Sequence, residues 1–281
     1  MQTPCLSALL DDEPELLTLP VIVNDLLALI DAPDARIEQI IALVSGDAAL
    51  SARVLRVINS PYYALPVKVD SVQNAVNLMG LQNLRDLVIA TKVAERFRDF
   101  PGQVVDVRSF WENSLFAASL ARDIYRALGL NRDNLFAVAL LHHLGTMVML
   151  QKLPRQMEAI LKSVRGNYTD LFDAELAEFG YSHADVGAEL LHSWGMPEVF
   201  VEVTRHHHDF YQSPHYATES AIVHLADTVA QQVCPLVNYE GLALEPDLAV
   251  FRYVTLAPDR LDRLYQAVRS RGGDAAVLIG E

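Results

Sequence analysis

The sequence has few cysteines and lacks a long uninterrupted apolar run. Cys5 and Cys234 are the only cysteines among 281 residues, which argues against a disulfide framework and a cysteine-rich zinc site. No stretch of about 18 consecutive apolar residues occurs, so we expect no membrane-spanning helix. The N-terminus is acidic and lacks the basic segment of a secretory signal. These absences predict a cytoplasmic protein.

Positive charge is also in short supply. The chain has 22 Lys and Arg against 36 Asp and Glu, a net charge of −14. Because phosphate backbones repel such a surface, we expect no nucleic-acid binding. Residues 51–98 are a local exception and indicate either a set of solvated helix faces or a docking surface for an acidic partner. Their basic residues are Arg53, Arg56, Lys68, Arg85, Lys92, Arg96 and Arg98; we expect Arg53 and Arg56 to point outward.

Helical periodicity dominates the chain, and no alternating strand pattern is convincing, which predicts an all-α fold. In residues 47–63, Leu50, Val54 and Ile58 recur at helical spacing, with Asp47 as a candidate N-cap. A helix is likewise predicted within residues 70–80, with Ser71 or Asp70 as the candidate N-cap and Gly80 as its end. Further helices are predicted at about 20–31, 36–45, 81–91, 108–128, 132–150, 181–197, 197–211 and 216–235.

Residues 137–150, "AVALLHHLGTMVML", are apolar around the whole predicted helix, which predicts a central, buried helix with Leu141, Leu144 and Val148 in the core. His142 and His143 lie in the middle of this run. Burial favours a neutral imidazole, which is also the form that binds metals. The pair therefore indicates either core histidines that hydrogen-bond to a neighbouring helix, or ligands to a metal between helices.

All nine histidines lie between residues 142 and 224. Helical proteins build metal centres from imidazoles and carboxylates that face inward from several helices. Adjacent histidines on a helix point about 100° apart, so we expect one of each adjacent pair to face elsewhere. Spacing leaves two possibilities open, a metal site and a dry hydrogen-bonded cluster. The candidates beyond His142 and His143 are His183, His206, His207, His208 and Asp227.

Several motifs occur in the order typical of one family. Residues 17–89 contain "LTLPVIVNDLLALI", "GDAALSARVLRVINSPYYAL" and "AVNLMG", and the second half contains "FWENSL", "LLHHLG", "YSHADVGAELLHSWGMPEVF", "HHH" and "IVHLAD". Over residues 15–235 the chain resembles HDOD domains. The resemblance implies an N-terminal helical lobe (15–100) packed on a degenerate HD-like lobe (107–235). The Pro-Gly pair in residues 98–107 predicts a linker there. Residues 236–281 would form a C-terminal helical extension and tail.

The resemblance also implies a metal-ligand set, because the parent HD superfamily binds divalent metals through histidines and aspartates. Its first histidine falls on Asn113, and the histidine and aspartate that give the superfamily its name fall on His142 and His143. Two ligand positions are therefore lost. The retained positions are His142, His183, His207, His208 and Asp227, with His206 and His207 as the pair if the register slips by one.

HDOD domains are related to HD and HD-GYP phosphohydrolases, and are generally regarded as non-catalytic bacterial proteins of signal transduction. Loss of the bridging aspartate is expected to abolish two-metal hydrolysis. The main hypothesis is therefore a non-catalytic regulatory module that binds a regulatory protein or a small nucleotide ligand. We expect no cofactor; the alternative is one Fe, Mn or Zn ion in a relic site. The rival function is a metal-dependent phosphohydrolase acting on a nucleotide or cyclic dinucleotide, and a third is a nucleotide sensor without turnover.

Overall fold

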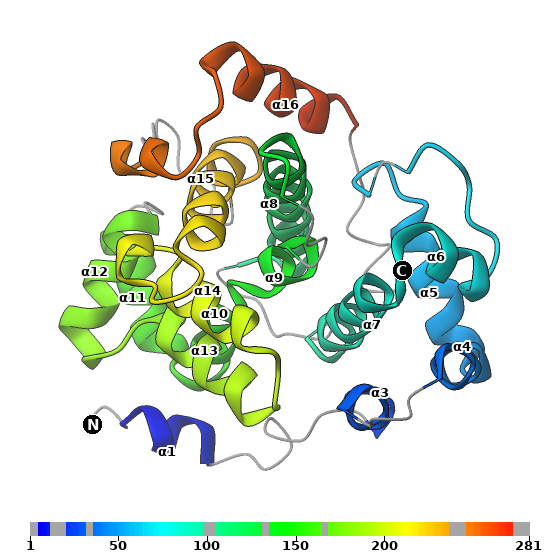
Figure 1. The fold of residues 1–281 in the computed structure, drawn as a ribbon. Helices are drawn as coiled ribbons and strands as arrows, with labels where there is room; N and C mark the ends of the chain where they lie inside the picture. The colour runs from blue at the N-terminus through cyan, green and yellow to red at the C-terminus, as the bar shows by residue number, and fades with distance from the viewer. Residues whose placement is uncertain are drawn as a thin grey trace.

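The computed structural model describes residues 5–11, 21–31, 36–63, 65–97, 105–130, 135–164, 168–235 and 246–271. Every regular element in these ranges is a helix (Figure 1). The all-α prediction is confirmed. Part of the expected linker (98–104), the segment 236–245 and the tail from residue 272 lie outside the described ranges.

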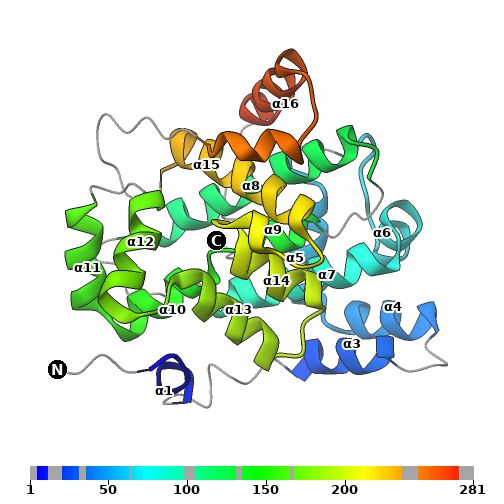
Figure 2. The same cartoon turned by 60° about the vertical axis from the view of Figure 1, so that its left-hand side comes forward.

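A first group of helices forms one side of the molecule. Its members α3 to α7 pack mainly on one another, and α7 also contacts α9 of the second group. Figures 1 and 2 both show this group beside the remaining helices, with α1 (Leu6–Asp11) apart from it. Its members are α3 (Val21–Asp31), α4 (Ile37–Gly46), α5 (Ala48–Ile58), α6 (Val72–Met79) and α7 (Leu81–Arg96).

The second group contains the histidines. In it α8 packs on α9 and α15, and α13 packs on α10 and α14, while α16 lies across α8 (Figure 2). Its members are α8 (Val107–Ala127), α9 (Leu135–Leu141), α10 (Leu144–Lys152), α11 (Pro154–Ser163), α12 (Tyr168–Phe179), α13 (His183–Ser193), α14 (Glu198–His206), η1 (Phe210–Gln212), α15 (Ala217–Val233), η2 (Leu248–Arg252) and α16 (Pro258–Arg271).

Local capping signals begin and end several helices where the sequence predicts. The Asp47 carboxylate accepts the Leu50 backbone N–H at 2.9 Å, and the Ser71 hydroxyl accepts the Asn74 N–H at 3.2 Å. Each such cap stabilises its helix by about 1 kcal/mol. Gly80, at the end of α6, has a φ of 83°, a conformation that costs little without a Cβ.

The two groups meet where the loop after α5 contacts α8. The Tyr62 carbonyl oxygen accepts hydrogen bonds from the Ser119 hydroxyl at 2.7 Å and from the Arg122 guanidinium at 3.0 Å. The Arg122 guanidinium also lies 4.7 Å from the Tyr63 ring centroid and 5.3 Å from that of Phe136. A buried cation between two aromatic faces and a carbonyl is stabilised by all three. These contacts position the first group of helices against α8 and α9.

The prediction of one helix over residues 132–150 is wrong in one respect, because the chain forms two helices there with His142 and His143 between them. α9 ends at Leu141 and α10 begins at Leu144. His142 Nδ1 lies 2.6 Å from the Ala139 carbonyl oxygen, so the side chain engages a carbonyl that a continuing helix would use. The helix predicted over 197–211 ends early in the same way, at His206, with His207 Nδ1 2.6 Å from the Thr204 carbonyl oxygen.

The expected outward position of Arg53 is also wrong. Arg53 is buried, and its guanidinium pairs with Glu95 of α7 at 2.6 Å. Lys92 pairs with Glu95 at 3.0 Å and with Asp47 at 3.5 Å. These basic groups therefore hold α5 against α7 instead of forming a free docking surface. Arg56 is exposed, as expected.

The segment Leu135–Lys152 has the length and apolar composition of a membrane span, but 89% of it is buried inside the protein. Leu141, Leu144 and Val148 are all buried, which confirms the predicted core position of this segment. Its hydrophobicity therefore serves the interior packing of the second helix group.

Replacing Leu144 with alanine should lower the free energy of unfolding by about 2–5 kcal/mol, because the substitution leaves a cavity in the core. Urea titration followed by circular dichroism measures this change. Leu78→Ala on α6 is the matched control, since Leu78 is 44% exposed and should lose less than about 1 kcal/mol. Equal losses in the two variants would contradict a central position for α10.

Candidate metal centre

A close contact between α10 and α13 brings the histidine-bearing segments together. A Cβ on Gly145 would overlap the His183 carbonyl oxygen and lie 2.6 Å from the Gly187 backbone nitrogen. A Cβ on Gly187 would lie 3.1 Å from the Gly145 nitrogen and 3.0 Å from the Thr204 methyl group. Only glycine permits this approach. As a result the rings of His143 and His183 lie 5.4 Å apart between centroids.

Six side chains from four parts of the chain converge at this contact. The α9–α10 turn contributes two, α13 one, the turn after α14 two, and α15 one. They form two overlapping groups of four, and the ligand atoms of each group lie within 4.8 Å of one another. The first group is His143, His183, His207 and His208, and the second is His142, His143, His207 and Asp227.

Both members of the pairs His142–His143 and His207–His208 reach the cluster, against the expectation that one of each pair would face elsewhere. The ring centroids are 3.9 Å apart in His142 and His143, and 4.1 Å apart in His207 and His208. The expected 100° separation holds for a regular helix. Here both pairs lie where a helix ends, so successive side chains can point into one space.

His142 and His207 are oriented in the same way. Each places Nδ1 2.6 Å from the carbonyl oxygen three residues earlier, Ala139 or Thr204. Because a carbonyl can only accept, Nδ1 carries the proton and Nε2 presents a lone pair. Both Nε2 atoms are buried without a hydrogen-bond partner; that of His142 lies 3.4 Å from an Asp227 oxygen. Buried acceptors left unpaired are costly, and a metal ion would satisfy both.

His183 is held by a carboxylate that the sequence did not single out. Glu175 Oε2 accepts hydrogen bonds from His183 Nδ1 at 2.6 Å and from the His183 backbone N–H at 2.8 Å, and both side chains are fully buried. This leaves His183 Nε2 directed at His208 Nε2, 3.0 Å away. A carboxylate behind a histidine is a common outer partner of metal sites. Glu175 lies on α12 and matches no local motif, so only the fold identifies it.

The imidazoles of the cluster differ in how readily they take up a proton. Burial, and then the neighbouring histidines, hold the pKa values of His143, His207 and His208 well below their usual value. Burial alone would also lower the pKa of His183, but the Glu175 carboxylate and its hydrogen bond outweigh burial and raise it. Neutral imidazole is the metal-binding form.

The separations fit a single metal ion. With metal–nitrogen bonds of about 2.1 Å, neighbouring ligands lie roughly 3.0–3.4 Å apart and opposite ligands about 4.2 Å apart. The Nε2 atoms of His183 and His208 lie 3.0 Å apart, which matches neighbouring ligands, and the ligand atoms of each group lie within 4.8 Å of one another, so a small inward shift would complete the coordination. Imidazoles with one carboxylate suit Zn, Fe, Ni or Cu better than Mg or Ca.

Two residues considered from the sequence lie outside both groups. His206 turns away and pairs with Asp209 at 2.9 Å, so the adjacent pair in the cluster is His207 and His208. Asn113 donates from its amide nitrogen to the Cys234 carbonyl oxygen at 2.9 Å. Its side chain therefore connects α8 to the end of α15.

Gly145→Ala should destabilise the protein by at least about 1–3 kcal/mol, because the added methyl group forces α10 away from α13. Chemical denaturation measures the loss. Gly46→Ala is the control, since nothing lies within 4 Å of a Cβ at Gly46, and its effect should be neutral or slightly stabilising. If both variants unfold at the same denaturant concentration as the parent, the two helices do not depend on this contact.

The sequence and the fold of this chain are similar to those of known proteins. The model of the HDOD domain matches residues 16–210. An uncharacterised protein of Treponema pallidum (strain Nichols) is 27% identical over 213 residues, which are 73% of this chain and 39% of that protein. The chain thus spans about two fifths of the length of this curated relative.

Solved structures share the fold. A structure from Shewanella amazonensis SB2B, named provisionally as a phosphohydrolase, superposes with a TM-score of 0.73 at 22% identity and covers 99% of this chain and 98% of its own. An HDOD domain protein of unknown function from Geobacter sulfurreducens gives 0.66 at 25% identity, over 94% and 87% of the two chains. A Marinobacter aquaeolei VT8 protein, named provisionally in signal transduction, gives 0.66 at 20% identity, over 99% and 62%.

The matched region contains α3 to α14, and with them every residue of the cluster except Asp227. This match covers more than half of the sequence and agrees with the motifs, the helical fold and the structural relatives. The chain belongs to the HDOD family.

Proposed function

We propose that this protein is a non-catalytic regulatory module of bacterial signal transduction in the cytoplasm, whose histidine cluster holds one buried divalent metal ion. The observation that carries the proposal is the burial of five of the six candidate ligands; the sixth, His208, is partly exposed. His142, His143, His183 and His207 are at most 1% exposed, and Asp227 is 4% exposed. A catalytic metal keeps an open position for water or substrate, whereas a structural metal is enclosed by its ligands.

The composition of the cluster supports the same proposal. Asp227 is the single carboxylate in the two candidate groups found among the described residues. Position 143, where the superfamily resemblance expects the bridging aspartate, holds an imidazole instead. Two-metal hydrolysis uses two ions about 3.5–4 Å apart that act on one displacement. With a single carboxylate, the charge of a second ion would be poorly compensated.

His143 and His207 belong to both groups, so one ion in either group would use the same two imidazoles. In the first group the bound ion would hold the α9–α10 turn and the turn after α14 to α13, and in the second group it would hold the same two turns to α15. It would supply structural cohesion to these segments. The regulatory output would then pass to a protein partner or respond to a small nucleotide ligand.

The runner-up function is a metal-dependent phosphohydrolase acting on a nucleotide or cyclic dinucleotide. It is supported by the convergence of six ligand-type side chains on one point. The provisional name of the Shewanella amazonensis protein agrees with it. The absence of a carboxylate at position 143 and the burial of the ligands favour the regulatory proposal.

Metal analysis tests the site. We expect about one divalent ion per chain in protein purified without chelators, and a rise in melting temperature when metal is returned to stripped protein. His207→Ala should remove most of the metal, while His206→Ala, next to it but outside the cluster, should retain it. Glu175→Gln should keep the fold and weaken metal affinity about 10–100-fold, because it loosens the orientation of His183.

The same preparations decide between the two functions. Bis-p-nitrophenyl phosphate and a cyclic dinucleotide are incubated with protein supplied with manganese or iron, and no turnover is expected. Metal-stimulated hydrolysis that His142→Ala abolishes would favour the phosphohydrolase. Equal metal content in the parent, His206→Ala and His207→Ala proteins would refute the cluster as a metal site.

A further inference from the structure

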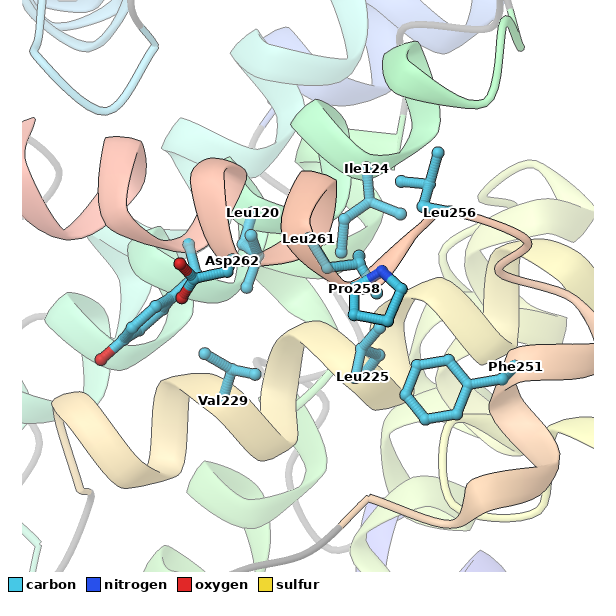
Figure 3. A pocket seen from close by; sticks show the side chains of 10 residues that line it. Leu120, Ile124, Leu225, Val229, Phe251, Leu256, Pro258, Leu261 and Asp262 are labelled. Atoms are coloured by element: carbon cyan, nitrogen blue, oxygen red, sulfur yellow. The ribbon is translucent and has the colours of Figure 1, made fainter.

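A second candidate binding site lies away from the histidine cluster, between α8, α15 and α16. Here the structure contains a cavity of about 360 Å³. Its walls are apolar and come from Leu120 and Ile124 of α8, Leu225 and Val229 of α15, Leu261 of α16, and Phe251 of η2 (Figure 3). Small-molecule sites typically measure about 300–1,000 Å³ and have mainly apolar walls.

The size of the cavity sets the size of its occupant. Protein interiors are close-packed, and voids larger than a water molecule are few. An apolar cavity of about 150 Å³ is large enough to hold benzene. The space beside α16 is more than twice that volume, so it accommodates a medium-length alkyl chain or a molecule with two small rings.

The helix that covers the cavity is held at its far end. Arg271, the last residue of α16, pairs with Asp123 of α8 at 2.7 Å and donates to the Ser119 hydroxyl at 3.2 Å. The Tyr265 ring meets the Phe116 ring edge-on, with 6.5 Å between centroids. The first half of α16 then spans the cavity and leaves it open at one side, where Phe251 is 43% exposed. A small molecule can enter while α16 stays attached to α8.

Charge at the rim indicates the chemical class of the occupant. Asp262 is the one charged side chain among the described residues that line the cavity. Figure 3 shows its carboxylate at the opposite end of the lining from Phe251. The carboxylate is exposed and lies 3.5 Å from the Gln266 amide nitrogen. Asp262 therefore attracts a cation and repels a carboxylate.

We infer that this cavity binds a small amphipathic amine, with its apolar body against the leucine, isoleucine and valine walls and its ammonium group beside Asp262. The apolar walls supply the binding free energy, because they remove the body of the ligand from water. The rim carboxylate adds selectivity, since an exposed ion pair contributes little on its own. This site is independent of the histidine cluster, and α15 and α16 lie beyond residue 210, where the family match ends.

Calorimetric titration of the full chain with n-decylamine, n-decanol and n-decanoate, each below its micellar concentration, tests the proposal. We expect saturable binding of decylamine at one site, about tenfold tighter than that of decanoate. Asp262→Asn should reduce the affinity for decylamine about threefold to fivefold, the size of an exposed ion pair, and bring it close to that of decanol.

Two filling variants test the location. Val229→Trp and Leu261→Trp place an indole into the cavity from α15 and from α16, and each should weaken decylamine binding at least tenfold. Gln232→Trp, at an exposed position of α15 outside the lining, is the matched control and should bind as the parent does. Circular dichroism identifies any variant that fails to fold, and the other filling variant then carries the test.

Three outcomes would overturn the inference. No saturable binding of any of the three probes would exclude the cavity as a site. Parental affinity in a folded filling variant would place the binding elsewhere. Decanoate binding as tightly as decylamine would refute the amine class.

Discussion

The close approach of α10 and α13 is the constraint on which the histidine cluster depends. Gly145 and Gly187 allow the backbones to meet at a separation that a single Cβ would prevent. His143 immediately precedes α10 and His183 begins α13. The close contact of the two backbones therefore places both imidazoles at the same point without help from side-chain interactions. The turn after α14 and the helix α15 then complete the cluster from the other side.

Burial determines the chemistry of the cluster. Imidazoles removed from water and crowded against one another favour the neutral state, and their lone pairs need partners. Backbone carbonyls and Glu175 occupy the Nδ1 atoms of His142, His207 and His183. The Nε2 atoms of these residues are left facing inward. The outer partners thus fix the orientation of each ring, and one divalent ion in either group would satisfy two of these three lone pairs.

Under the proposed function, the burial of most of the ligands favours metal binding without hydrolysis. A structural metal is enclosed by its ligands, whereas a catalytic metal keeps an open position for water or substrate. An apolar cavity of about 360 Å³ lies apart from the cluster, beneath α16. The helix α15 takes part in both places, with Asp227 in the cluster and Leu225 and Val229 in the cavity wall. A structural centre and a separate ligand cavity are compatible with a regulatory role.

The sequence by itself determined the helical fold, most helix positions and the candidate ligands, because these follow from local periodicity, capping residues and motif order. Asp47 and Ser71 cap their helices as predicted. Only the tertiary structure decided that His142 and His143, and likewise His207 and His208, all face inward. Both pairs lie where a helix ends, so their side chains are not held about 100° apart as in a regular helix. It also decided that Arg53 is buried against Glu95, and that Glu175 supports His183. Contacts between segments distant in sequence produce these features, and no local pattern records such contacts.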